Sequence, residues 1–449
     1  MGGGWRCRWS IEILIASLAT FSLLALRLAS AAPIPQSAPD AVSAFSVNTE
    51  RLWDHTVSRR LEGDGWATAG RYHAAHVLML PLHAAFSQHY ESGEREFTDH
   101  VERFFAHRSE VQFVPATELS WLQYLYLISE FLVLAASHGH PELVPDGLPA
   151  QMRSWVDELW RVRPAWHWTR GPFDGMGERV RWKLASSRPG VGELSYPGVI
   201  LDSEIFLLAI AADLRNYGRL VGSPLAGDPL LDTIAAVALD VYRQRVVWHP
   251  GGGWTFQPGL WRDHPNYRHA CRVRKEPGLR ACILPDIAED ASHSHRSPLW
   301  LRSLAGGSPA GSPERHYYQA LARGLEEQFF GRVLEPPSSE FDGWRMRNFM
   351  DGRNGIYRWE YPSLGPDQGY GAYELSGTLL HGWWAFLPGE RARRLYRDLA
   401  TRFPLPEEQL LIYAGPARRM PSTGVLRDGM AELLCRLAAE LPRSAYGGL

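Results

Sequence analysis

The segment Asp286–Arg296 holds the densest group of side chains that could carry out acid–base chemistry. In it, Asp290 precedes His293 and His295, and Arg296 follows them directly. A histidine whose ring is oriented by a carboxylate is a suitable general base near neutral pH, and a guanidinium can neutralise a substrate carboxylate. Residues two positions apart on an α-helix point in directions about 200° apart, so only one of the two histidines can face a shared site.

Two other roles fit the same segment. Asp290 or Ser292 is a suitable N-cap for the helix that the apolar run after Arg296 predicts. Alternatively, the His-x-His pair and Asp290 could hold a metal ion if the backbone there is irregular. Our main expectation is that there is neither a metal ion nor another cofactor.

A second candidate group lies at Tyr370–Gly377. On a helix, Tyr370 and Tyr373 would be about one turn apart, with Glu374 beside them. Glu374 is the only charged residue in an apolar stretch, so it is either an ion-pair partner or an acid with a shifted pKa. The predicted catalytic set is therefore Asp290, His293, His295, Tyr370, Tyr373 and Glu374.

Several aromatic and charged residues elsewhere are candidates for binding a substrate. Exposed indole rings offer apolar faces on which sugar rings can stack, although long loops also need apolar cores of their own. The predicted substrate-binding residues are Tyr196, Asp202, Glu204, Trp254, Trp261, Arg296, Arg358 and Trp359. Tyr72, His73 and His76 share another apolar segment, where a role in the core is the simpler interpretation.

The elements that would position these residues are helices. Apolar periodicity and helix-breaking residues predict twelve of them: Val42–Arg60, Trp66–Tyr90, Glu94–Ala106, Thr117–His138, Leu148–Val162, Gly198–Leu220, Pro229–Val246, Asp290–Leu304, Pro313–Phe330, Tyr370–Leu387, Gly389–Arg402 and Gly424–Leu441.

The connections between these helices alternate in length. Those after even-numbered helices are short, whereas long insertions follow the fifth, seventh, ninth and eleventh helices, at 163–196, 247–289, 331–369 and 403–423. In an up-and-down chain, all of these insertions open at the same end. The even-numbered helices are apolar almost all round and the odd-numbered ones carry charged faces, so the even set should form an inner ring.

Alternating outer and inner helices of this kind resemble the (α/α)6 toroid, the six-hairpin barrel of many glycan-cleaving enzymes. The resemblance is architectural and covers nearly the whole chain after its N-terminal segment. It implies an all-α fold in which residues 42–449 form one toroid catalytic domain, with long loops and the active site at one mouth. It also implies the activity of a polysaccharide lyase or a glycoside hydrolase.

Within that class, our leading expectation is cleavage of an acidic, uronate-containing poly- or oligosaccharide by β-elimination. The reaction needs a cation for the carboxylate, a base for the C5 proton and an acid for the leaving oxygen. Arg296 or an insertion arginine, His293 or His295, and Tyr370 or Tyr373 are the candidates, and toroidal lyases use similar sets.

Two alternative functions stay open. A glycoside hydrolase would use two of Asp202, Glu204, Asp290 and Glu374 as its acid and base. A non-catalytic periplasmic glycan-binding protein would use the same residues only as ligands.

The N-terminus predicts export to the periplasm or beyond. Residues 1–31 have basic residues, an apolar run and a final Ala29-Ser30-Ala31, as in a cleaved signal peptide, and residues 32–41 read as a flexible leader. Contact with a membrane is expected only if the signal is not cleaved. Cys271 and Cys282 then either form a local disulfide or stay free thiols.

The distribution of charge predicts the class of partner. The formal net charge of −2 argues against nucleic acid. Lys and Arg nevertheless outnumber Asp and Glu in the insertions 163–196 and 247–289. This excess favours an acidic saccharide as the partner, although solvated loop charges would give the same count.

Overall fold

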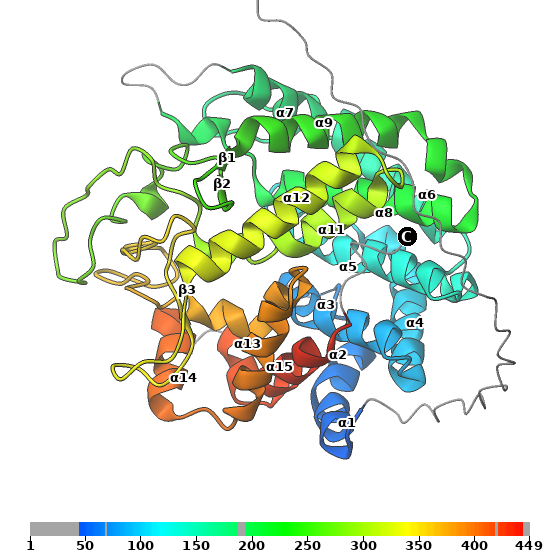
Figure 1. Cartoon of the computed structure of the whole chain (residues 1–449). Coiled ribbons are helices and arrows are strands. Elements are labelled where there is room, and N and C mark those ends of the chain that lie inside the picture. The colour runs from blue at the N-terminus through cyan, green and yellow to red at the C-terminus, as the bar shows by residue number, and fades with distance from the viewer. Residues whose placement is uncertain (1–44, 68–69, 187–193, 418–420, 443–449) are drawn as a thin grey trace, which may run out of the picture. The chain divides into compact units, whose positions relative to one another are not determined.

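The computed structural model describes residues 45–67, 70–186, 194–417 and 421–442 (Figure 1). These residues are mostly helical, which confirms the all-α class. The predicted signal peptide and the leader lie outside the described residues.

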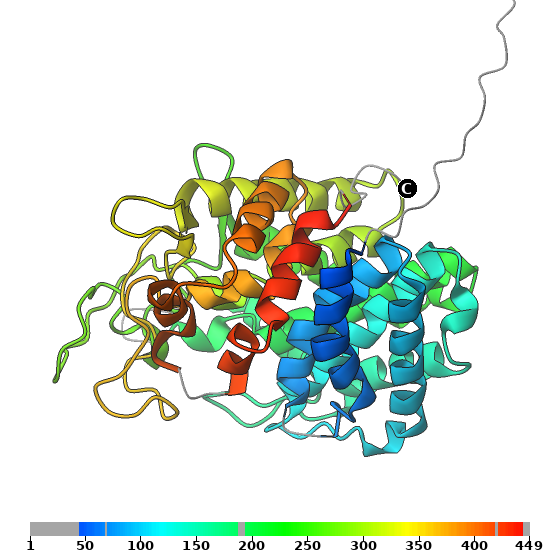
Figure 2. The same cartoon turned by 90° about the horizontal axis from the view of Figure 1, so that it is seen from below.

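Seven buried elements make a closed succession of contacts. α3 packs on α5, α5 on α8, α8 on α11 and α11 on η10; η10 and η9 both pack on α15, and α15 packs back on α3. In Figures 1 and 2 the C-terminal α15 lies beside the N-terminal α1. The bounds of these elements are α3 Arg71–Ser87, α5 Glu118–Ser137, α8 Asp202–Val221, α11 Ser297–Gly307, η9 Ser376–His381, η10 Trp383–Phe386 and α15 Met430–Glu440.

Amphipathic helices precede these buried elements along the chain. In α13 the buried residues are Ala392, Leu395, Tyr396 and Leu399, which recur at helical spacing on one face. By contrast, α3 is buried without a break from Ala75 to Phe86. The preceding helices are α1 Val47–Trp53 with η1 Asp54–Ser58 and α2 Arg59–Glu62, then α4 Glu91–Ala106, α6 Leu148–Asp157 with η4 Glu158–Val162, α9 Pro229–Arg245, α12 Pro313–Gln328 with η8 Phe329–Val333, and α13 Glu390–Thr401.

Among the described helices, α5 is long and apolar enough to cross a membrane by length and composition. Most of it is buried, and it packs between α3 and α8. Its apolar surface is thus accounted for by contacts within the protein.

The prediction of a tenth helix at Tyr370–Leu387 is wrong. Residues before Ser376 are not helical, and the rest forms two 3-10 segments joined at Gly382. Gly382 has a φ of 81°, and a Cβ there would lie 2.3 Å from the side chain of Leu80. A left-handed glycine that also packs closely explains why an apolar run is not one α-helix.

The predicted eighth helix is interrupted. It divides into α10 Ala291–Ser294 and α11, with His295 and Arg296 between them. Pro298 causes the break, because it lacks an N–H and its ring would clash with the carbonyl of Ser294 in a continuous helix. The interruption lets Asp290 cap a short helix that carries His293 alone out of the core.

The long insertions contain structure that periodicity did not predict. They hold the helices α7 Met176–Ala185 and α14 Glu407–Ala414 and two antiparallel hairpins. In one hairpin Val247 of β1 (Val246–Trp248) pairs with Thr255 of β2 (Trp254–Phe256). In the other, Leu334 of β3 (Leu334–Glu335) pairs with Met346 of β4 (Arg345–Met346).

Buried polar side chains tie the insertions to one another. Gln257 exchanges two hydrogen bonds of 2.9 Å with the backbone of Ile200, and the Asp263 carboxylate accepts bonds from the N–H and hydroxyl of Ser195. Asn348 donates to the carbonyls of Gly355 and Gly371. Cys271 and Cys282 form the local disulfide. The loops around the mouth are therefore held in place.

A buried ion cluster joins α7 to α8. Glu204 is fully buried and accepts bonds from Lys183 Nζ at 2.8 Å and from Arg179 Nε at 2.7 Å. Burial lowers the pKa of Lys183 to about 8. Glu204 is thus a structural residue, and its prediction as a substrate ligand is wrong. Two of the basic residues in the insertion 163–196 are used here to neutralise it.

We predict that Lys183→Met lowers the free energy of unfolding by about 3–5 kcal/mol, because it removes one partner of a buried charge. A matched control is Arg436→Met, which breaks a partly exposed pair with Glu432 on α15 and should cost about 0.3–0.5 kcal/mol. Urea unfolding of both variants measures the difference. Equal losses would contradict a structural role for this cluster.

Candidate functional site

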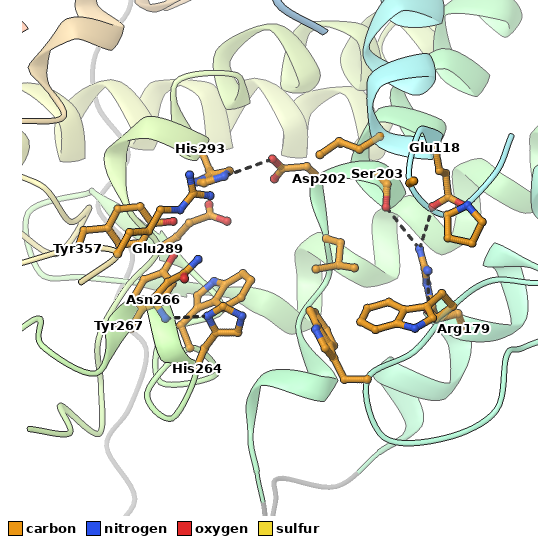
Figure 3. Close-up of a pocket in the computed structure, with 18 residues that line it drawn as sticks. Glu118, Arg179, Asp202, Ser203, His264, Asn266, Tyr267, Glu289, His293 and Tyr357 are labelled. Atoms are coloured by element: carbon orange, nitrogen blue, oxygen red, sulfur yellow. Dashed lines mark hydrogen bonds and ion pairs between the residues drawn. The ribbon is translucent and has the colours of Figure 1, made fainter. Parts of the chain in front are cut away.

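The main pocket is a cavity of about 500 Å³ at the N-terminal ends of α5, α8 and α10. Residues from the insertions complete it, among them Trp166, Trp261 and Arg358. Figure 3 shows His293, Glu289 and Tyr357 along one side and Glu118 and Arg179 along the other. Three of the four long insertions, 163–196, 247–289 and 331–369, therefore meet around one cavity, and the insertion 403–423 contributes none of its lining residues.

Asp290 is the most heavily hydrogen-bonded residue at this pocket. Its carboxylate is fully buried and accepts bonds from the hydroxyl of Tyr267 at 2.8 Å and from the N–H groups of Ser292 and His293. Burial alone would raise the pKa of Asp290, but the His293 ring and these donors hold it below its ordinary value. Asp290 is thus an ionised side chain that caps α10 and does not face the pocket.

His293 is the side chain that Asp290 directs into the pocket. Its Nδ1 lies 2.8 Å from Asp290 Oδ2, and its Nε2 lies 4.0 Å from Asp202 Oδ2 (Figure 3). The short contact requires the proton on Nδ1, since a carboxylate can only accept. In the neutral ring Nε2 is therefore a free lone pair directed at the cavity, as a general base requires.

Arg296 lies behind the pocket wall. It donates hydrogen bonds to the Asp202 carboxylate and the Tyr72 hydroxyl, and its Nε donates to His76 Nε2 at 3.1 Å. It is 2% exposed and does not line the main pocket. The structure therefore does not place Arg296 at the pocket surface, and its charge is paired with Asp202.

His295 turns away from His293, as their spacing predicted. Its Nδ1 donates to the Ser292 carbonyl, and its ring stacks on His76 with a centroid distance of 5.3 Å and lies 5.8 Å from His381. Burial, with Arg296 nearby, lowers the pKa of His295 well below its ordinary value. His295 is thus a neutral core residue and not a catalyst.

The metal alternative does not fit this geometry. It required His295 to face the same ion as His293 and Asp290, whereas the two rings lie on different sides of α10. No group of three His, Cys, Asp or Glu side chains within the described ranges is arranged to hold a metal ion.

Two acidic residues of the pocket were not predicted. Glu289 is 5% exposed, and burial, together with the charges of Asp202 and Asp290, raises its pKa well above 4.5. On the other wall, burial also raises the pKa of Glu118 despite Arg179 at 3.9 Å. Glu289 directly precedes Asp290, so the sequence cluster contained it, but nothing in the sequence distinguished its protonation from that of its neighbours.

Aromatic rings form a continuous wall of the pocket. Trp168 contacts Tyr196, which contacts His264, and Trp261 stacks on Tyr267 at 5.1 Å with an interplanar angle of 12°. The structure thus places Trp261 at the pocket and Tyr196 behind Trp168. The buried Nε1 of Trp261 has no hydrogen-bond partner among the described residues.

Two predicted tryptophan ligands lie elsewhere. Trp254 is 3% exposed and donates to the Leu321 carbonyl, and Trp359 is buried and lies near His269. Neither ring lines the main pocket, and Trp254 is part of the main apolar core.

Arg358 lines the pocket as a second cation besides Arg179. Its guanidinium lies 5.2 Å from the ring centre of Tyr357 and 4.7 Å from that of Tyr361, and its backbone has a φ of 54°. A non-glycine residue in this left-handed region is costly, and such residues are common at functional sites. No carboxylate in the described part of the chain forms an ion pair with Arg358, and its buried Nε has no hydrogen-bond partner there.

The predicted group Tyr370, Tyr373 and Glu374 is divided. Tyr370 pairs with Tyr357 through an isolated antiparallel bridge, and Glu374 pairs with Lys275 at 2.8 Å. Tyr373 has a φ of 67° and lies against Arg345, 4.0 Å from ring to guanidinium. None of the three lines the main pocket, so the structure does not bring them together with His293 there. The absence of a helix before Ser376 is the physical reason.

No family model matches this chain, and no curated protein or solved structure matches it. A function must therefore be argued from the geometry of the pocket.

We predict that Glu289→Gln stabilises the protein increasingly as the pH rises above about 4.5. Folding raises the pKa of Glu289, so the folded protein keeps a proton that the unfolded chain releases, and this contribution to stability falls as the pH rises. Urea unfolding between pH 4.5 and 8 should show a widening gap between Glu289→Gln and wild type. The exposed Glu102→Gln on α4 should show none, and a constant gap for Glu289→Gln would contradict the raised pKa.

Proposed function

We propose that this protein is an exported enzyme that cleaves a uronate-containing poly- or oligosaccharide by β-elimination, on an (α/α)6 toroid. The closed succession of buried elements from α3 to α15 supports a ring of inner helices. The predicted signal peptide and the disulfide in the insertion 247–289 support export.

The orientation of His293 is the observation that carries the proposal. A buried, ionised carboxylate holds Nδ1, and the free Nε2 is directed into a cavity with aromatic walls. A general base within a cavity of this kind suits removal of a proton from a bound sugar ring. Arg358, which has no carboxylate partner in the part of the chain that the structure describes, lies in the same cavity and suits a sugar that carries a carboxylate.

The proposed reaction assigns one role to each of three residues. Arg358 binds the uronate carboxylate, which makes the C5 proton more acidic. His293 Nε2 takes that proton. The electron pair of the broken C5–H bond then forms the C4–C5 double bond while the C4–O bond breaks. Glu289, whose protonated form is favoured because burial raises its pKa, gives its proton to the leaving oxygen. One product then carries a new C4–C5 double bond, and the other a new hydroxyl group.

A second candidate function is supported by the carboxyl pair Glu289 and Asp202. Glu289 has a raised pKa and Asp202 carries the charge that helps to raise it, which is the division expected of an acid and a base in a glycoside hydrolase. Asp202 is held by Arg296, however, and His293 would then have no role. The hydrolase is therefore the less favoured of the two.

We predict that His293→Gln and Asp290→Asn each lower kcat by about 10²–10⁴-fold, because one removes the base and the other its orientation. The assay is ultraviolet absorbance of the double bond, with alginate, pectate, glucuronan and glycosaminoglycans as substrates. A matched control is His316→Gln on the exposed surface of α12, which should leave kcat unchanged. Full activity of His293→Gln would contradict the proposal.

The products distinguish the two candidate functions. For β-elimination we expect new reducing ends and ultraviolet absorbance to appear in equal amounts, and Asp202→Asn to keep measurable activity. For hydrolysis, reducing ends would appear without absorbance, and Asp202→Asn would be as inactive as Glu289→Gln. The ratio of the two signals from wild-type protein therefore decides between them.

A further inference from the structure

A second, smaller cavity lies on the other side of Tyr357 and Arg358. It has a volume of about 140 Å³ and shares only these two residues with the main pocket. Tyr370, Glu374, His381 and Ala414 are among the residues that complete it. Three of the residues predicted from sequence, Tyr370, Glu374 and Arg358, therefore line this second pocket.

The two pockets meet at the pair formed by Asp290 and His293. His293 lines the main pocket and Ser292 lines the second pocket, and both side chains bond to the carboxylate of Asp290. Tyr357 and Arg358 form the common wall opposite them. A saccharide with one unit in each pocket would have the bond between these two units beside His293.

The chemistry of the second pocket suits a sugar unit that is neutral or negatively charged. Glu374 is paired with Lys275 through both of its carboxylate oxygens, so its charge is neutralised. Burial lowers the pKa of His381 to about 3, so this ring is neutral, and its buried Nδ1 has no hydrogen-bond partner among the described residues. The cation Arg358 is shared with the main pocket.

We propose that the second pocket binds the sugar unit adjacent to the one in the main pocket, so that the enzyme requires substrate on both sides of His293. This inference rests on the proposed function, because it names the same saccharide as the ligand. It implies cleavage within a chain and poor activity on substrates that fill the main pocket alone.

Filling the second pocket tests this inference. Ala414→Trp on α14 places a large ring in the cavity, and Leu411→Trp on the exposed side of the same short helix is the matched control. Thr378→Phe, which fills the same cavity from η9, is a second variant in case Ala414→Trp does not fold. Thermal unfolding checks that each variant is folded.

Binding is measured with the full-length His293→Gln protein, which leaves oligomers intact. The probes are defined oligomers of two to five units from alginate, pectate and glucuronan, titrated by calorimetry. We expect Ala414→Trp to weaken binding of the longer oligomers by about tenfold or more, a loss of about 1.4 kcal/mol, and to leave the shortest bound oligomer unaffected. In active protein, kcat/KM for the polymer should fall by a similar factor.

The outcomes separate the inference from the proposed function. Two results together would overturn the role of the second pocket and leave the proposed function standing. These are turnover by wild type, and binding in Ala414→Trp and Thr378→Phe that depends on oligomer length as it does without these substitutions. Length-dependent binding that both variants remove, without turnover by wild type, would keep the pocket and overturn the enzymatic function. Failure of every oligomer to bind would overturn both.

Discussion

The bond between Asp290 and His293 is the interaction on which the site depends. A carboxylate with no exposed surface is costly unless its oxygens are satisfied, and Tyr267, Ser292 and His293 satisfy those of Asp290. Those donors come from an insertion and from the first turn of α10, so the same contacts that stabilise the charge also fix the mouth of the pocket. The orientation of His293 follows from this requirement for hydrogen bonds.

The charges around that bond are arranged in two layers. Below the pocket, Arg296 pairs with Asp202, and the neutral imidazoles of His76 and His295 surround it. Facing the pocket, Glu289 has a raised pKa and Arg358 has no carboxylate partner among the described residues. A substrate carboxylate would therefore meet Arg358 and a Glu289 whose protonated form is favoured, while the charge of Asp202, which also lines the pocket, is paired with Arg296. This difference in pairing explains why Arg358, and not Arg296, is the better candidate for binding an anion.

The sequence predicted most of the fold and only part of the site. Long periodic segments such as Thr117–His138 and Pro229–Val246 are helices within one or two residues of their predicted ends, because their apolar faces are buried along their whole length. The prediction failed at Tyr370–Leu387, where Gly382 adopts a left-handed conformation, and at Pro298, which divides the eighth helix. Both are local backbone effects that an apolar pattern does not reveal.

For the site, spacing correctly separated His293 from His295, and the type and position of Asp290 indicated both its cap and its contact with the ring. Whether a charged side chain is free or paired could not be predicted from the sequence. Asp202, Glu204 and Glu374 are all paired in the structure. Their partners are Arg296, Lys183 and Lys275, which lie 94, 21 and 99 residues away in the chain. Pairing over such distances is decided by tertiary packing.

The most direct measurement is the tautomer of His293 in solution. Nitrogen-15 NMR of histidine-labelled protein, with His293 assigned by its loss in His293→Gln, reports which ring nitrogen carries the proton. We expect the neutral form of the ring to carry its proton on Nδ1 in the free protein and to lose that preference in Asp290→Asn. A ring protonated at Nε2, or a tautomer unchanged by Asp290→Asn, would contradict this expectation.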